Sequence, residues 1–91
     1  MSERRERLAR YIATDLLNQG DLVIGEDEDL LASGLLDSLS VMSLIHFIEQ
    51  DLSIDVPAED VTIENFVSLR TIDAYLGRRL EAVKQAEGRR P

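Results

Sequence analysis

Few side chains in this sequence are of the types that perform covalent chemistry. The sequence has no cysteine and one histidine, His46, which follows Ser38 by eight residues. On a helix that separation is ~12 Å along the axis, whereas a serine nucleophile and its base must lie ~2.6–3.2 Å apart. The acidic run Glu26–Asp29 lacks the central glycine and closing glutamate of an EF-hand loop. These residues therefore predict neither a catalytic serine–histidine pair nor a metal site.

The short motif Asp37–Leu39 is a stronger candidate for chemistry. It follows Ser33–Leu36, in which a Ser-Gly break precedes two leucines. Asp37 or Ser38 can act as the N-cap of a helix that continues to about Leu52. A helix N-terminus has unpaired N–H groups and partial positive charge, so it favours a phosphodiester on its first residues. Taken alone, the motif favours an ordinary N-cap.

This second helix has two distinct faces on a wheel of ~100° per residue. The expected core stripe consists of Val41, Leu44, Ile45, Ile48 and Leu52. The expected exposed flank beside Ser38 consists of Leu39, Met42, His46 and Glu49. Leu39 and Met42 lie ~100–160° from the centre of the stripe, so we expect them to dock partners rather than fill the core.

The other expected elements are also helical. A first helix is expected from about Glu3 to Asn18, capped by Gly20, and is followed by a long loop over residues 19–37 with a helical turn at Asp29–Ala32. A short helix is expected through Ile63, Phe66 and Val67, capped by Asp60 or Thr62. The last helix is capped by Ser68 and has an apolar stripe from Leu69 to Val83. The loop contains too many leucines, isoleucines and valines to be a free linker.

Composition agrees with one small all-α domain. The chain has 91 residues, 44% hydrophobic content and only 4% aromatic residues, which favours helix packing over a β-sandwich. We expect residues 1–85 to form the domain and residues 86–91 to be a disordered tail. Without cysteine, any thiol chemistry must come from an added group. No apolar run is long enough to span a bilayer, and we expect a cytoplasmic monomer.

The net charge of −8 is distributed unevenly. Every Lys and Arg lies in residues 1–10 or 70–91, and residues 11–69 contain 13 carboxylates and no basic side chain. Such a stretch would repel nucleic acid phosphates and anionic lipid headgroups, so we expect neither nucleic acid nor membrane as a partner. Basic protein surfaces are the natural complement, although acidity can also serve solubility alone.

The segment Leu31–Leu39, LASGLLDSL, closely resembles the phosphopantetheine attachment site of the acyl and peptidyl carrier protein family. The resemblance covers nearly the whole chain and implies a small acyl-carrier-like four-helix bundle, with three longer helices, one short helix and a long first loop. It also implies that Ser38 receives a 4'-phosphopantetheine arm from coenzyme A. Asp37 and Leu39 complete the motif, and Asp37 would help to position the Mg²⁺-dependent transferase.

By this resemblance the protein is a non-catalytic carrier that holds an acyl or aminoacyl group as a thioester. Its implied partners are a phosphopantetheinyl transferase, an acyl- or aminoacyl-loading enzyme, and a downstream synthase or transferase. Ser40, Ser43 and Gln50 stand where carriers of fatty acid synthesis often have acids, which favours polyketide, nonribosomal peptide or other specialised metabolism. The alternative is an unmodified acidic helical module that binds a basic partner.

Overall fold

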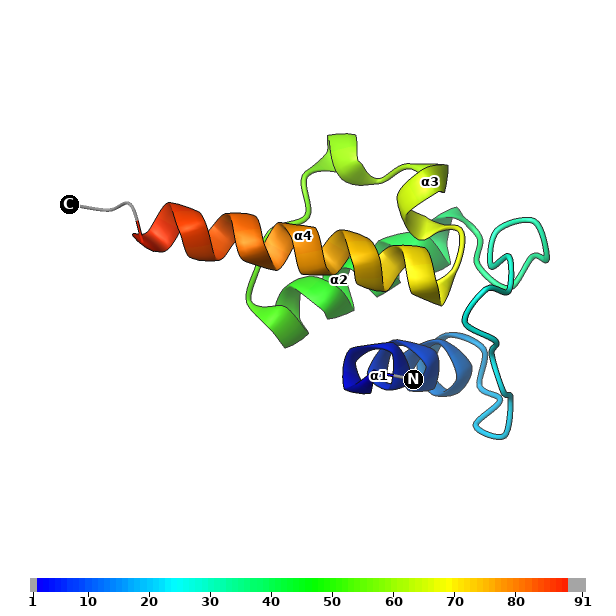
Figure 1. Cartoon of the computed structure of the whole chain (residues 1–91). Coiled ribbons are helices and arrows are strands. Elements are labelled where there is room, and N and C mark those ends of the chain that lie inside the picture. The colour runs from blue at the N-terminus through cyan, green and yellow to red at the C-terminus, as the bar shows by residue number, and fades with distance from the viewer. Residues whose placement is uncertain (1, 89–91) are drawn as a thin grey trace.

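The protein is a bundle of helices, with no strand among residues 2–88, which the computed structural model describes (Figure 1). The elements are α1 (Glu3–Tyr11), a π-helix η1 (Ile12–Leu16), α2 (Ser38–Leu52), a 3-10 turn η2 (Ala58–Asp60), α3 (Ile63–Phe66) and α4 (Leu69–Gly88). Three longer helices, one short helix and a long first loop confirm the expected all-α architecture. None of the described helices is long and apolar enough to cross a bilayer.

The first helix differs from the expected continuous α-helix. After Tyr11 it widens into the π-helix η1, where the N–H of Leu17 donates to the carbonyl of Ile12 at 3.0 Å. The wider turn inserts a residue into the helical register, and Asp15, which interrupts the apolar pattern in the sequence, is exposed. Asn18, with φ of 52°, adopts the left-handed conformation that ends the helix, so the expected cap at Gly20 is wrong.

The long loop is fastened to the bundle rather than free. The N–H of Leu30 donates to the carbonyl of Val67 at 2.7 Å, and the N–H of Arg70 donates to the carbonyl of Glu26 at 3.0 Å. Leu30 is fully buried, and the Asp29 carboxylate caps the expected helical turn by accepting from the N–H groups of Leu31 and Ala32. The segment that leads to α2 is therefore held in place by the junction of α3 and α4.

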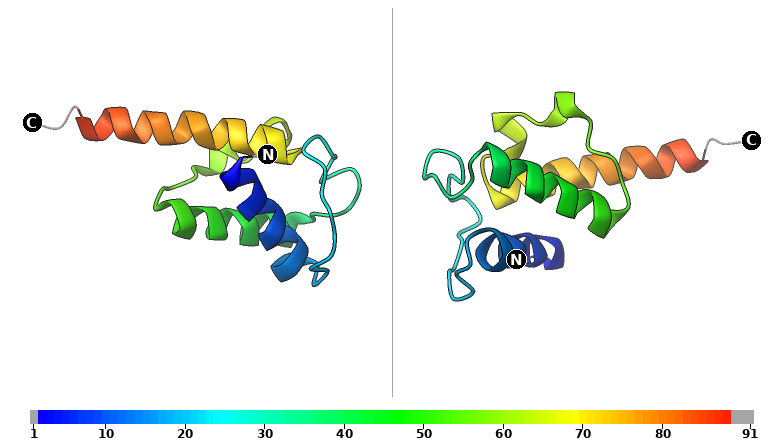
Figure 2. Two further views of the ribbon diagram at one scale, coloured as in Figure 1. Left: turned by 60° about the horizontal axis from the view of Figure 1, so that its bottom comes forward. Right: turned by 180° about the vertical axis from the view of Figure 1, so that it is seen from behind.

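The core is formed mainly by side chains of α1, α2 and α4, whose arrangement is seen in the two views of Figure 2. Its largest fully buried side chains are Ile12, Leu30, Leu44, Ile48, Phe66, Leu69, Ile72 and Leu76. Of the stripe expected on α2, Leu44, Ile45 and Ile48 are buried, and Val41 and Leu52 are half-buried. The helical phase predicted for α2 is thus confirmed.

Helix α4 is longer than its apolar stripe indicates. It continues to Gly88, and its last turns extend past the other helices (Figure 2). Residues 86–88, expected to belong to a disordered tail, are helical, and they continue a segment, Glu81–Glu87, in which all residues except Val83 have high helix propensity. The remainder of the expected tail, residues 89–91, lies outside the described residues.

Arginines from both ends of the chain neutralise carboxylates of the acidic middle. Arg5 binds Glu26 at 2.5 Å, Arg7 binds Asp51 at 2.8 Å, and Arg70 binds Asp27 at 2.7 Å. These contacts join α1 and α4 to the loop and to α2. Acidic and basic residues that are separated along the sequence therefore lie next to each other in the folded protein.

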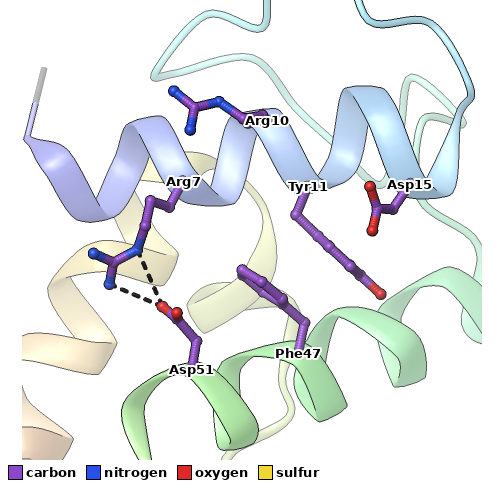
Figure 3. Close-up of a pocket in the computed structure, with 6 residues that line it drawn as sticks. All are labelled: Arg7, Arg10, Tyr11, Asp15, Phe47 and Asp51. Carbon is purple, nitrogen blue, oxygen red and sulfur yellow. Dashed lines mark hydrogen bonds and ion pairs between the residues drawn. The ribbon is translucent and has the colours of Figure 1, made fainter.

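The contact between α1 and α2 holds the side of α2 that faces away from Ser38. The ring of Tyr11 stacks on that of Phe47, with centroids 4.2 Å apart and planes within 9° (Figure 3). Arg7 and Asp51 close the same hollow of about 250 Å³. Phe47 follows Ser38 by nine residues, which is ~180° around a helix. Packing against α1 therefore leaves the Ser38 side of α2 uncovered.

Candidate functional site

The first turn of α2 places an unbonded serine hydroxyl at the surface. The sequence allowed either Asp37 or Ser38 to cap this helix, and the structure assigns the cap to Asp37, whose Oδ1 accepts from the N–H of Ser40 at 2.8 Å. Ser38 is the first helical residue and is exposed. Within residues 2–88 its hydroxyl makes no hydrogen bond. Because the neighbouring carboxylate caps the helix, the Ser38 hydroxyl is not engaged as the cap.

The cap also determines the charge beside Ser38. The hydrogen bond donated by the backbone N–H of Ser40 lowers the pKa of Asp37 below its ordinary value. Asp37 is therefore ionised at neutral pH. Its Oδ1 accepts from the N–H of Ser40, and hydrogen bonds from the Ser40 side chain and the Leu39 backbone also lower its pKa. An ionised carboxylate therefore stands next to the unbonded hydroxyl.

The other serines near α2 lie in different environments. The Ser33 hydroxyl accepts from the N–H of Leu35 in the preceding loop. Ser40 is half-buried, and Ser43 lies in the second turn of α2, where its carbonyl accepts from the Tyr11 hydroxyl at 3.3 Å. Of these four serines, Ser38 alone combines exposure with the first helical position and an unbonded hydroxyl.

An open hollow of about 480 Å³ lies beside Ser38. It is lined by Leu31, Leu36, Asp37, Ser38, Val41, Met42, Val61, Thr62, Ile63 and Phe66. Leu36 and Phe66 are buried and form its apolar base, whereas Met42 and Ile63 are exposed. The hollow is open to solvent and is shared by the start of α2, the end of the long loop and α3. It offers an apolar surface within reach of any group on Ser38.

The expected partner-binding residues lie in two different environments. Leu39, Met42 and His46 are exposed, Leu39 at 80% and Met42 at 64%. Glu49 is half-buried, and its Oε2 accepts from the N–H of Val56 at 2.9 Å. Glu49 therefore ties the end of α2 to the following loop. Because the carboxylate is engaged in this hydrogen bond, it is less available to a partner.

Ile63 is an exposed apolar residue at the site that the helical pattern did not single out. It begins α3, is 72% exposed and lines the hollow beside Ser38. Helix α3 has only four residues, so one turn of sequence contains no periodicity from which its outer face could be predicted. Its position next to the α2 surface depends on how the chain folds back after the Val56–Pro57 segment.

The acidic run in the loop is engaged by the protein itself. Glu26 and Asp27 bind arginines, Glu28 accepts from the N–H of Gly25 at 3.3 Å, and Asp29 caps the loop turn. Hydrogen bonds and ion pairs with Arg70 lower the pKa of Asp27. No group of three or more His, Cys, Asp or Glu side chains in the described part of the chain is placed to hold a metal ion.

Comparison with known proteins agrees with this geometry. The family described as "Phosphopantetheine attachment site" matches residues 6–76. A solved structure described as "Crystal structure of FAD-dependent dehydrogenase" contains a chain that is 29% identical with a TM-score of 0.68; the match covers 75% of this chain and 96% of that one. No curated protein matches. Because the family match spans well over half of the sequence and includes the exposed serine at the start of α2, the chain belongs to the phosphopantetheine-binding family of acyl and peptidyl carrier proteins.

Proposed function

We propose that Ser38 is the residue to which this carrier's 4'-phosphopantetheine is attached. The observation that supports it most is the division of roles at the start of α2, where Asp37 caps the helix and the Ser38 hydroxyl is left exposed and unbonded. In the attachment reaction the Ser38 oxygen forms an ester bond to the phosphorus that bears the pantetheine. Adenosine 3',5'-bisphosphate leaves coenzyme A, and the transferase accepts the hydroxyl proton.

The residues around Ser38 fit such a group. The first turn of α2 presents backbone N–H groups toward a phosphodiester on its first residue, and a helix N-terminus stabilises negative charge there. Asp37 would help to position the Mg²⁺-dependent transferase. The arm supplies a terminal thiol on which cargo is held as a thioester, chemistry that a chain without cysteine cannot provide itself. The hollow beside Ser38 offers apolar contact to what is attached there.

The carrier role implies a set of partner enzymes rather than a reaction on this chain. We propose a phosphopantetheinyl transferase, an acyl- or aminoacyl-loading enzyme and a downstream synthase or transferase, in polyketide, nonribosomal peptide or other specialised metabolism. The similar chain in a structure described as an FAD-dependent dehydrogenase makes a flavin-dependent oxidation of the carried group a candidate for one downstream step. Loading trials with acyl and amino acids, followed by a flavin dehydrogenase assay, would identify the cargo.

The alternative is an unmodified acidic module that binds a basic partner. Several carboxylates that would form its acidic face, including Glu26, Asp27 and Asp51, are already paired with arginines of this chain. Such pairing reduces the charge left for a basic partner. The carrier function is therefore the better supported of the two.

One experiment separates these functions. The purified protein is incubated with coenzyme A, Mg²⁺ and a broad-specificity phosphopantetheinyl transferase, and its intact mass is measured. We expect a gain of one phosphopantetheinyl group for the wild type and for Ser43→Ala, a matched exposed serine on the same helix, and no gain for Ser38→Ala. An unmodified wild type would support the interaction module, and peptide mapping of the arm to another serine would overturn the site.

A further inference from the structure

The segment between α2 and α4 has little packing of its own. It contains only the three-residue turn η2 and the four-residue helix α3, and in Figure 1 it loops out before it returns to α4. Val56 and Phe66 are buried at its two ends, but none of the residues between them, Pro57–Asn65, is buried. We call Pro57–Asn65 the wall segment, because three of its residues line the hollow beside Ser38: Val61, Thr62 and Ile63. Side-chain burial alone therefore holds this wall of the hollow weakly.

Hydrogen bonds centred on Asp60 hold the wall segment to the rest of the protein. Asp60 ends η2, and its Oδ2 accepts from the Tyr75 hydroxyl of α4 at 2.6 Å. Its carbonyl accepts from Nδ2 of Asn65 at 2.9 Å and from the N–H of Thr62 at 3.0 Å. One residue thus joins η2, α3 and α4.

Tyr75 is itself firmly placed. It is 5% exposed, and the centroid of its ring lies 5.9 Å from that of Phe66, which forms part of the base of the hollow. Burial and, after it, the hydrogen bond to Asp60 raise the pKa of Tyr75 above its ordinary value. The hydroxyl therefore keeps its proton at neutral pH and remains a hydrogen-bond donor.

Two arginines of α4 also reach this region, but from more exposed positions. Arg78 donates to Oδ1 of Asn65 at 3.3 Å, and Arg79 donates to the carbonyl of Asp55, which precedes the wall segment. A bond from a buried hydroxyl to a carboxylate contributes more than exposed bonds that water can replace. The bond from Tyr75 is therefore the main polar attachment of the wall segment to α4.

We infer that the Tyr75 hydroxyl is a remote positioning group for the candidate site: through Asp60 it holds the wall segment and so sets the width of the hollow beside Ser38. Its meaning for the cargo rests on the proposed attachment at that serine. With the wall segment in place, an apolar acyl group on the arm has contact on two sides of the hollow, from Met42 of α2 and from Ile63 of α3. Release of the wall segment removes one of the two sides.

Methyl NMR spectra test the positioning role on the protein before an arm is attached. Tyr75→Phe removes the hydroxyl and keeps the ring against Phe66. In this variant the methyl signals of residues that line the hollow should shift or broaden, and these residues are Met42, Val61 and Ile63. The signals of Val23, which lines a different hollow against α1, should not change.

Further variants show whether the effect passes through the one hydrogen bond. Asp60→Ala should change the same methyl signals, and its combination with Tyr75→Phe should change them no further. Asp60→Asn, which keeps an acceptor oxygen, should restore most of the wild-type spectrum. Tyr11→Phe is the matched control, because that hydroxyl donates to the carbonyl of Ser43 at 3.3 Å, outside the wall segment. It should leave the signals of the hollow unchanged.

Thioester reactivity of the loaded protein provides the functional readout. Acetyl and octanoyl groups are placed on the arm, and the rate at which hydroxylamine cleaves each is divided by the rate for the same group on free pantetheine. In the wild type the octanoyl ratio should be about fourfold lower than the acetyl ratio, which corresponds to the burial of one methylene group. Tyr75→Phe should remove most of this difference, and Tyr11→Phe should keep it.

Two results would overturn the inference. One is that the methyl signals of the hollow are the same in Tyr75→Phe as in the wild type. The other is that wild type and Tyr75→Phe show the same difference between octanoyl and acetyl ratios, or that neither shows any. Thermal melts check that each variant is folded, and Asp60→Ala tests the same bond if Tyr75→Phe melts early. Failure of the wild type to accept any arm would instead refute the proposed function, and the NMR result would stand apart from it.

Discussion

Asp73 connects α4 to the N-terminal turn of α1, and its replacement by Asn gives a sharp test of the fold. The carboxylate is buried, 6% exposed as a residue, and accepts from Arg4 and, at 2.7 Å, from Arg5. Burial raises the pKa of Asp73, but the hydrogen bonds from Arg4 and Arg5 outweigh it, so the pKa lies below its ordinary value of 3.8. The ionised form is therefore the one that the folded protein stabilises.

The size of the effect follows from the two hydrogen bonds. An asparagine at position 73 has one amide oxygen, which can still accept a hydrogen bond from one of the two arginines. Its NH₂ group would face the second arginine, and two donors cannot form a hydrogen bond with each other. One charge-assisted hydrogen bond is lost, which costs about 2 kcal/mol. Arg4 and Arg5 keep partial contact with water, so no fully buried charge is left behind. For a domain of this size, that loss corresponds to a decrease of about 8–16 °C in Tm.

The pH dependence has a definite sign. Because the pKa of Asp73 is lowered in the folded state, its stabilisation is complete well above the ordinary value of 3.8 and is lost as pH falls through the folded pKa. Thermal unfolding followed by circular dichroism at neutral pH should give Asp73→Asn a Tm well below that of the wild type. The difference between the two Tm values should become smaller in acid. Asp55→Asn, an exposed carboxylate, is the control. Equal melting temperatures at neutral pH, or a gap that does not change with pH, would refute this reasoning.

Substitutions at three further positions test α2. Ile48→Glu should unfold the domain because it buries an unpaired charge in the core, and a cooperative melt of this variant would show that the helical phase is wrong. Asp37→Ala should lower the free energy of unfolding by about 1 kcal/mol in a denaturant titration, and Asp37→Asn, which keeps the cap, should not. Glu49→Ala should also cost about 1 kcal/mol through the lost bond to the Val56 N–H, and an unchanged stability together with slower partner encounter would instead assign Glu49 to docking.

Local sequence was sufficient to predict α2 and its exposed serine. A cap residue marks where a helix begins, and 15 residues contain about four turns, enough to distinguish the buried side from the exposed side. The burial of Ile48 and the exposure of Leu39 and Met42 were therefore predictable. Which of Asp37 and Ser38 provides the cap was not, since both residue types can accept the bond and only the backbone geometry at the junction distinguishes them.

Short and irregular elements were less predictable. One turn of α3 has no period, so the exposure of Ile63 beside the site followed only from the fold. The π-helix and the left-handed Asn18 result from how α1 meets the loop, which propensity alone does not encode. Glu49 falls on the outer flank of an ideal helix, yet the returning chain brings the Val56 N–H to its carboxylate.

Charge shows most clearly what each level of structure determines. The sequence alone established that residues 11–69 contain 13 carboxylates and no base, because composition is independent of folding. Tertiary structure determined which of those carboxylates are neutralised, since Arg5, Arg7 and Arg70 reach their partners across 21 to 44 residues of chain. Coulomb interactions depend on distance in space and not on separation along the chain. For that reason the arginines at the two ends of the sequence offset carboxylates of its acidic middle only once the chain is folded.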